Sequence, residues 1–287
     1  MLNPREYLTC LRINDWLHSL GLAILGIAFY SPASLFTLPA FWGLIISALY
    51  LAHGFSLNNC FDAAIDQYIH KKYLPPARTS YTKFLIFSYL LLFINCLMGY
   101  FFSRNTIILV ICGSILALIY SAPPWRLKKY TAPNIILNSA GFAIIFLIGF
   151  IAVGGRITLK ATLLTLFFAL FFIPLQIIHQ ISHAQADKLE NIPTLINRFG
   201  LKTTLHLFCW SLLLLLCWSL LVGLTYPPYL GVFFLTTLFC CLIWLALSRI
   251  KFGNEPYPQT AAALRIFVRK ICILFGSILL TIFYFAN

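Results

Sequence analysis

Apolar residues occur in nine long runs along the chain, and a short polar segment separates each run from the next. Such runs, of about 17–25 residues, are long enough to cross the hydrocarbon core of a bilayer as α-helices. Short connections with turn residues such as Ser31-Pro32, Gly154-Gly155 and Pro227-Pro228 favour antiparallel neighbours. The pattern predicts an all-α polytopic membrane bundle of nine transmembrane helices, at about residues 15–32, 36–56, 83–102, 105–121, 134–154, 161–181, 204–224, 228–248 and 264–286.

The composition supports a membrane protein. Of the 287 residues, 61% are apolar and 9% are charged, whereas an average soluble domain has about 25% charged residues. The mean hydropathy is +0.91. These values exclude a soluble enzyme, a disordered chain, a coiled coil and a secreted disulfide scaffold. The nine cysteines form no Cys-x-x-Cys pair, and we interpret them as small apolar core residues.

Charged residues gather on one face of the predicted bundle. Only three of the 20 basic residues fall on the other face, namely Arg104, Arg156 and Lys160. The basic face is cytoplasmic by the positive-inside rule, and it can attract anionic lipid. Basic residues in short loops between spans argue against nucleic-acid binding. All seven acidic residues lie on the same cytoplasmic face: Glu6, Asp15, Asp62, Asp66, Asp187, Glu190 and Glu255.

A polar stripe continues from the second apolar run. Asn58, Asp62 and Asp66 are spaced i, i+4, i+8, so a helix places them on one face over two turns. Two carboxylates and an amide offer the oxygen ligands that Mg²⁺ prefers. The alternative is a solvated helix end, where two aspartates are ordinary. Ionisable groups at the ends of membrane helices favour a functional site.

A matching stripe ends the sixth run. His179, His183 and Asp187 repeat the same spacing at the same membrane edge. A cavity between the two stripes would hold metal bridged by phosphate, while the histidines with Asp187 also suit zinc or iron. The alternative is that these histidines only form hydrogen bonds within the bundle.

A third polar segment follows the fourth run and reads Tyr120-Ser-Ala-Pro-Pro-Trp-Arg126-Leu-Lys128-Lys129. The two prolines end the helix. The loop then offers a phenol and several cations, and arginine and lysine are the expected partners of phosphate oxygens. Positive-inside charge alone accounts for any single lysine here, but not for the order of the residues.

These motifs resemble those of the UbiA superfamily of intramembrane prenyltransferases. Asn58, Asp62 and Asp66 match its NxxxDxxxD pattern, and the segment from Tyr120 to Lys128 is similar to the Tyr-Ser-x-Pro-Pro-x-Arg-x-Lys loop of several branches. Nine helices is also the count of that family. The resemblance spans nearly the whole chain and includes further matches at Arg12, Trp16, Thr194-Leu195 and Phe199-Gly200.

The second stripe departs from the family pattern. The family usually has DxxxD there, and this chain has His183 in place of the first aspartate and Asp187 in place of the second. Asn191 stands where glycine is common. After the first motif, many members have an Arg-Pro pair, whereas this chain reads Lys71-Lys72-Tyr-Leu-Pro-Pro-Ala-Arg78. Because a neutral imidazole is a poor Mg²⁺ ligand, His183 is expected to bond the diphosphate or to transfer a proton.

The resemblance implies a single prenyltransferase domain over residues 1–287, which transfers a polyprenyl group from its diphosphate to a lipophilic acceptor such as an aromatic quinone precursor. It implies that Asp66 or His183 takes the proton of the acceptor. Mg²⁺ would be held by Asn58, Asp62, Asp66 and Asp187. The diphosphate would be bound by Lys71, Lys72, Tyr120, Arg126 and Lys128.

Two alternatives stay open. One is a relative that transfers phosphoribose to a polyprenyl phosphate, although its usual His-Pro-x-Lys run after Asp66 is absent. The other is a transporter or lipid-binding membrane protein without catalysis. Polar groups at one membrane edge, rather than at the midplane, favour an enzyme. We expect an integral protein of a bacterial inner membrane with its active site at the cytoplasmic face. Its partners would be the diphosphate donor, the acceptor and membrane lipid, with no protein partner implied.

Overall fold

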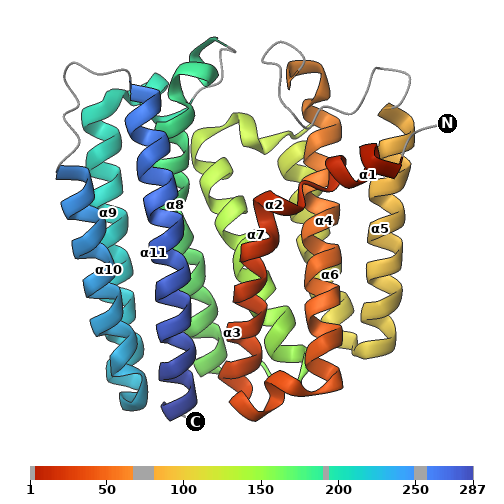
Figure 1. Ribbon diagram of the computed structural model, residues 1–287, viewed down its shortest axis with the longest axis vertical. Helices are drawn as coiled ribbons and strands as arrows, with labels where there is room; N and C mark the ends of the chain where they lie inside the picture. The colour runs from red at the N-terminus through yellow and green to blue at the C-terminus, as the bar shows by residue number, and fades with distance from the viewer. Residues whose placement is uncertain (1–3, 67–80, 190–193, 249–256, 287) are drawn as a thin grey trace. The chain divides into compact units, whose positions relative to one another are not determined.

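The structure is a computed structural model that describes residues 4–66, 81–189, 194–248 and 257–286 (Figure 1). Within these ranges it does not describe the side chains of residues 4, 63–66, 182, 183, 185–189, 247, 248 and 257–265. The described elements are all helices: α1 (Pro4–Leu11), α2 (Ile13–Trp16), η1 (Leu17–Ser19), α3 (Leu20–Tyr30), η2 (Pro32–Phe36), α4 (Leu38–Asp66), α5 (Tyr81–Phe102), α6 (Arg104–Ser121), η5 (Leu127–Lys129), α7 (Thr131–Ala152), α8 (Leu159–Leu189), α9 (Leu195–Thr225), η6 (Pro227–Tyr229), α10 (Leu230–Ser248) and α11 (Tyr257–Ala286).

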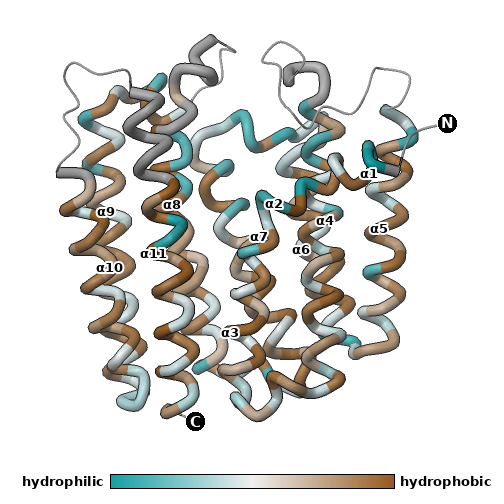
Figure 2. Tube along the Cα trace, viewed as in Figure 1, coloured by the Kyte–Doolittle hydropathy of each residue, from teal (hydrophilic) through white to brown (hydrophobic). Residues whose placement is uncertain are grey.

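Eight of the described helices, α4 to α11, include segments that are long and apolar enough to cross a membrane. Figure 2 shows hydrophobic residues along most of their length. The prediction of an all-α polytopic membrane bundle is therefore confirmed. The first predicted span, residues 15–32, is broken: the 3₁₀ turn η1 separates α2 from α3, which has 11 residues. The polar residues His18 and Ser19 lie in that turn.

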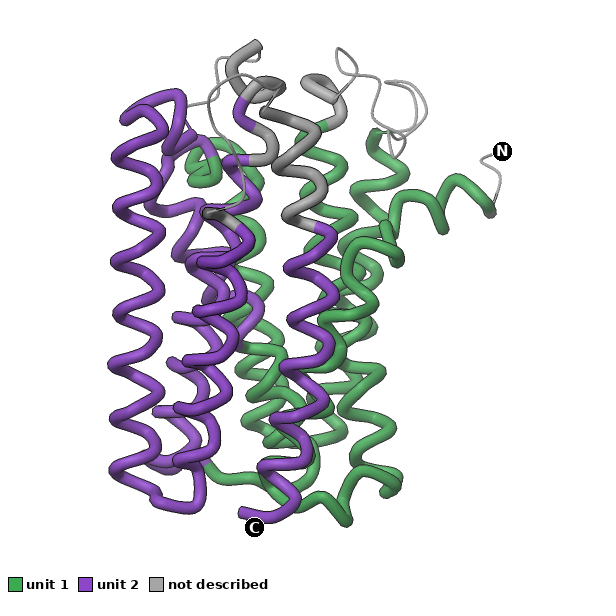
Figure 3. The backbone as a smooth tube through the Cα atoms, turned by 60° about the vertical axis from the view of Figure 1, so that its left-hand side comes forward, with its two compact units in different colours: residues 1–128, 144–156 green, residues 129–143, 157–287 purple. Residues whose placement is uncertain are grey.

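The chain forms two compact units, which Figure 3 distinguishes by colour. Unit 1 contains residues 1–128 and 144–156, and unit 2 contains residues 129–143 and 157–287. Helix α7 belongs to both, because its residues 131–143 count with unit 2 and its last residues with unit 1.

Helix α4 is the centre of unit 1 and packs against α1, α3, α5 and α6. Helices α3 and α7 meet backbone to backbone at two glycines. A Cβ atom on Gly26 would lie 2.0 Å from the carbonyl oxygen of Phe146, and one on Gly149 would lie 2.1 Å from that of Ala23. Small residues allow this close approach, which is a common basis of helix packing in membranes.

A buried polar cluster joins α4 to α5. His53 is 1% exposed, and its Nδ1 lies 2.9 Å from the carbonyl oxygen of Ser88. The hydroxyl of Ser56 donates to the hydroxyl of Ser88 at 2.9 Å. These bonds satisfy polar groups that would be costly to leave unpaired in an apolar interior.

In unit 2, helices α8, α9, α10 and α11 form a closed ring of neighbours, since α9 packs on α8 and α10, and α11 packs on α10 and α8. Aromatic rings fill the core. The ring centroid of Phe171 lies 4.8 Å from that of Phe239 and 4.8 Å from that of Phe275. At the periphery of this core, the indole of Trp218 on α9 donates to the carbonyl oxygen of Leu163 on α8 at 2.9 Å.

Side chains from both helices fix the connection from α8 to α9. Gln180 is buried on α8, and its Oε1 accepts a hydrogen bond from the backbone N–H of Leu195 at 3.1 Å. In return, Asn197 on α9 donates from its amide to the carbonyl oxygen of Ala184 at 3.2 Å. The hydroxyl of Thr194 caps α9 by accepting from the N–H of Asn197. The last turns of α8 are thus tied to the first turn of α9.

Candidate active site

The candidate site is built at the C-terminal ends of α4 and α6. Helix α4 extends past its apolar run to Asp66, so that Asn58 and Asp62 lie one turn apart on the same face. Helix α6 ends at Ser121, and Ala122 is extended with φ −92° and ψ 144°. Pro123 disfavours the helical conformation of the residue before it, so the helix ends before Ala122. The loop that follows returns Arg126 and Lys128 to α4.

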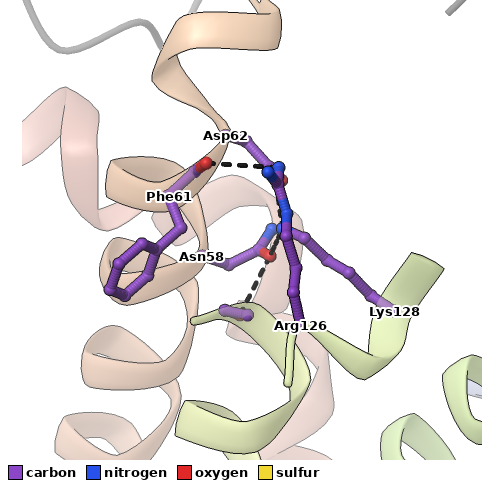
Figure 4. A network of polar contacts seen from close by, with 6 residues as sticks. Asn58, Phe61, Asp62, Arg126 and Lys128 are labelled. Carbon is purple, nitrogen blue, oxygen red and sulfur yellow. Dashed lines mark hydrogen bonds and ion pairs between the residues drawn. The ribbon is translucent and has the colours of Figure 1, made fainter. Parts of the chain in front are cut away.

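The amide oxygen of Asn58 accepts two hydrogen bonds from the α6 end and its loop (Figure 4). The ammonium of Lys128 donates to Asn58 Oδ1 at 2.6 Å, and the hydroxyl of Ser121 donates to the same oxygen at 3.1 Å. Asn58 therefore presents its oxygen, rather than its amide nitrogen, to the cationic loop.

The carboxylate of Asp62 pairs with two cations (Figure 4). Its Oδ1 lies 2.5 Å from Lys128 Nζ and 2.9 Å from Arg126 Nη2. Arg126 Nη2 also donates to the carbonyl oxygen of Phe61 at 3.3 Å. The side chains of Asp62, Arg126 and Lys128 are 19%, 17% and 12% exposed. Charge-assisted bonds of this kind are stronger than neutral ones, and low exposure limits their screening by water.

Arg126 has two unusual features. Its backbone has a φ of 39°, in the left-handed region that residues with a side chain rarely adopt. Its Nε–H is buried and has no hydrogen-bond partner among the described residues. A buried donor without a partner can form one more bond with an acceptor that enters the site.

Among the described side chains of this cluster, two cations contact one carboxylate, so Asp62, Arg126 and Lys128 together carry one net positive charge. Such a cluster attracts an anion with several oxygens, and a guanidinium and an ammonium are suited to phosphate. Lys128 Nζ also lies 5.9 Å from the ring centroid of Tyr120, which places that phenol beside the cluster.

A comparison with protein families decides the relationship of the chain. The model of the UbiA prenyltransferase family matches residues 19–271. The chain belongs to the UbiA prenyltransferase family. It is therefore a membrane-embedded prenyltransferase, and the resemblance seen in its motifs is confirmed. No curated protein gave a match.

Solved structures share the UbiA fold over almost the whole chain. A structure of digeranylgeranylglyceryl phosphate synthase has a TM-score of 0.74 and 20% identity, and the alignment covers 98% of each chain. A UbiA homologue from Archaeoglobus fulgidus bound to GPP and Mg²⁺ has a TM-score of 0.72 and 19% identity, with 96% of this chain and 99% of that chain covered. A UbiA homologue from Aeropyrum pernix K1 in its apo form has a TM-score of 0.66, 16% identity and coverage of 93% and 98%.

The structure of this UbiA-family chain brings together four predicted site residues from distant positions, Asn58, Asp62, Arg126 and Lys128, and places Tyr120 beside Lys128. Other predicted positions lie outside the described residues, as whole residues or as side chains: Asp66, Lys71, Lys72, His183 and Asp187. Over the described part of the chain, no three His, Cys, Asp or Glu side chains form a group that could hold a metal ion. The predicted four-residue metal set therefore stays a prediction.

The N-terminal segment of the UbiA-family chain contributes contacts that the motifs did not predict. Asp15 pairs with Arg12, with Oδ2 2.8 Å from both Nε and Nη2, and the Arg12 guanidinium lies 5.5 Å from the ring centroid of Phe55 on α4. The buried thiol of Cys10 lies against α4, where the Cys60 thiol donates a hydrogen bond to it and lowers the pKa of Cys10. The sequence signal for the pair of Arg12 and Asp15 was a basic and an acidic residue three positions apart.

Ser121 is the other site residue that was missed. It lies within the Tyr-Ser-x-Pro-Pro segment, so the motif contained it, but its role was not assigned. Its hydroxyl is buried and orients Asn58.

Proposed function

We propose that this chain transfers a polyprenyl group from a polyprenyl diphosphate to a lipophilic acceptor, such as an aromatic quinone precursor, in an Mg²⁺-dependent reaction. The observation that carries the proposal is the convergence of Arg126 and Lys128 on Asn58 and Asp62. This cluster combines phosphate-binding cations with hard oxygen ligands. The Archaeoglobus fulgidus homologue was solved with GPP and Mg²⁺, which supports the same class of substrate and cofactor here.

The described donor set fits a hard cation, because the oxygens of Asn58 and Asp62 already bind cationic groups in this structure. We propose that Asp66 and Asp187 complete the set that holds Mg²⁺. When bound, Mg²⁺ would supply neutralisation of the negative charge that develops on the leaving diphosphate. Arg126 and Lys128, with Tyr120, Lys71 and Lys72, would bind the remaining oxygens of the diphosphate.

The transfer breaks the bond between the allylic carbon of the donor and the diphosphate oxygen, and the electron pair leaves with the diphosphate. The acceptor then forms a bond to the allylic carbon and loses one proton. We propose that Asp66 or His183 takes that proton, because both belong to the polar stripes at the ends of α4 and α8. The guanidinium of Arg126 and the ammonium of Lys128 would stabilise the negative charge that accumulates on the leaving diphosphate.

The positive-inside pattern supports a cytoplasmic position for this end of α4. Lys83 lies in the first turn of α5, and Arg126, Lys128 and Lys129 follow the end of α6. We propose that the protein resides in a bacterial inner membrane and that residues 1–287 act as a single prenyltransferase domain.

The experiment is Mg²⁺-dependent diphosphate release by the detergent-purified protein. Donors would be prenyl diphosphates of several chain lengths, including geranylgeranyl diphosphate, each offered with a panel of lipophilic acceptors. We expect release that requires Mg²⁺, is lost in Asp62→Asn and persists in Lys129→Met. No release with any donor, or equal release in Asp62→Asn, would refute the proposal.

A further inference from the structure

The ammonium of Lys128 lies between Asn58 and Asp62, two of the residues that the sequence motif assigns to a metal ion. It contacts Asn58 Oδ1 at 2.6 Å and Asp62 Oδ1 at 2.5 Å, so it bridges the two described oxygens of the stripe. Arg126 contacts the same oxygen of Asp62 at 2.9 Å. Asn58 Oδ1 and Asp62 Oδ1 are thus both engaged by positive groups that belong to the chain itself.

We propose that Lys128 is a resident counter-ion that keeps the oxygens of Asn58 and Asp62 engaged until a diphosphate enters, so that a divalent cation is bound only together with the diphosphate. The inference deepens the proposed function and rests on it for the identity of the anion. It assigns to Lys128 a second task, which is the control of metal binding in addition to contact with the substrate.

Lys128 and a metal ion would compete for the same oxygens. An oxygen that accepts a short charge-assisted bond from an ammonium cannot at the same distance serve a metal ion, because the two positive centres would repel each other. The cluster of Asp62, Arg126 and Lys128 already has a net positive charge. A divalent cation that arrives alone must therefore displace Lys128 from Asn58 Oδ1 and Asp62 Oδ1, and it brings no anion that would accept the ammonium.

A diphosphate would change this competition. A diphosphate offers several acceptor oxygens, so Lys128 and Arg126 can exchange the carboxylate of Asp62 for phosphate oxygens. Arg126 has an unused donor for this purpose, since its Nε–H is buried and unpartnered among the described residues. Once Lys128 has moved, Asn58 and Asp62 are available to the metal. The two ligands then favour each other's binding, and this coupling is reciprocal.

The matched control lies one residue away. Lys129 is exposed in the same 3₁₀ turn, so Lys129→Met removes the same charge without freeing Asn58 or Asp62. The alternative is that Lys128 forms a permanent structural ion pair. In that case Lys128→Met would lower the stability of the protein but would not change its affinity for the metal. Size-exclusion profiles would establish that each variant is folded. Lys128→Gln provides a second neutral variant if Lys128→Met does not fold.

The experiment measures binding of Mn²⁺, as a spectroscopic substitute for Mg²⁺, by loss of the free-ion signal in electron paramagnetic resonance. Without diphosphate, we expect the Kd of Lys128→Met to be lower than that of the wild type by about tenfold or more, within the usual range of coupling between ligands. Lys129→Met should match the wild type, and Lys128→Met combined with Asp62→Asn should lose the gain.

A second set of titrations adds inorganic pyrophosphate, with a protein-free titration to account for the soluble Mn²⁺ complex. We expect pyrophosphate to strengthen Mn²⁺ binding to the wild type by about tenfold or more, and to do so much less in Lys128→Met. Equal Mn²⁺ affinity of wild type and Lys128→Met, or an equal gain in Lys129→Met, would overturn the inference. If the wild type nevertheless releases diphosphate from a prenyl donor, the proposed function stands. If Lys128→Met gains Mn²⁺ affinity but no prenyl donor is cleaved, the counter-ion role stands without it.

Discussion

Asp62→Asn removes the carboxylate that balances Arg126 and Lys128 while keeping the shape of the side chain. Both cations are mostly buried, at 17% and 12% exposed, so neither gains full hydration when its partner is lost. At an effective dielectric constant of about 20, each pair at these separations is worth about 6 kcal/mol before the cost of desolvation. Removal of one partner from a buried pair costs about 3–5 kcal/mol in net terms. Because the amide oxygen still accepts hydrogen bonds, we expect the lower end, about 3 kcal/mol.

The assay is thermal unfolding in detergent, followed by tryptophan fluorescence at one scan rate. For a chain of this size, a loss of about 3 kcal/mol lowers the Tm by about 6–12 °C. Lys128→Met alone leaves Asp62 paired with Arg126 and should cost about 1 kcal/mol. In the double variant, only Arg126 has lost its ion pair with Asp62, so the stability loss of the double variant should be smaller than the sum of the single losses by about 2 kcal/mol. Additivity within about 0.5 kcal/mol would refute the reasoning. The matched cycle with Lys129→Met should be additive.

Three further changes test the packing. Gly149→Leu places a side chain against the carbonyl of Ala23 and should destabilise the protein by about 3 kcal/mol. The control is Gly276→Leu, which should be neutral or stabilising because a Cβ atom there meets nothing within 4 Å. Equal Tm values for the two variants would contradict the close helix contact. Trp218→Phe loses one bond to an α8 carbonyl and should lower stability by about 0.6–1 kcal/mol, measured in the same scan. Gln180→Leu leaves the buried first N–H of α9 without an acceptor and should cost about 1–3 kcal/mol, with faster amide exchange at that N–H; unchanged exchange would exclude the bond.

Run length and helical spacing predicted most of the fold because each reports a local property. Eight apolar runs correspond to long helices, and the polar stripe after residue 56 correctly extended the second one to Asp66. The spacing of His179, His183 and Asp187 likewise predicted a helix beyond residue 181, and α8 continues to Leu189. The first run was expected to be one helix. The structure breaks it at Leu17–Ser19, where the polar residues His18 and Ser19 lie in a 3₁₀ turn.

The candidate site was predicted in pieces, and its assembly was not. The spacing of Asn58 and Asp62 on one helix follows from 3.6 residues per turn, and the cations after α6 follow from the motif. Arg126 and Lys128 contact Asp62 although they follow it by 64 and 66 positions in the chain, and no local pattern encodes such a contact. Asp62 was expected to bind Mg²⁺, and Arg126 and Lys128 were expected to bind the diphosphate. The structure instead shows that the loop's own cations contact it.

The left-handed backbone of Arg126 has a consequence for sequence variation. Glycine adopts a φ of 39° without steric cost, whereas arginine holds it against a strain of about 1–3 kcal/mol. Glycine at this position would relieve that strain but would also lose the bonds from Arg126 to Asp62 and to the carbonyl oxygen of Phe61. A library of variants at position 126, sorted in parallel by yield of folded protein and by product formed, should therefore place glycine much closer to arginine in yield than in product.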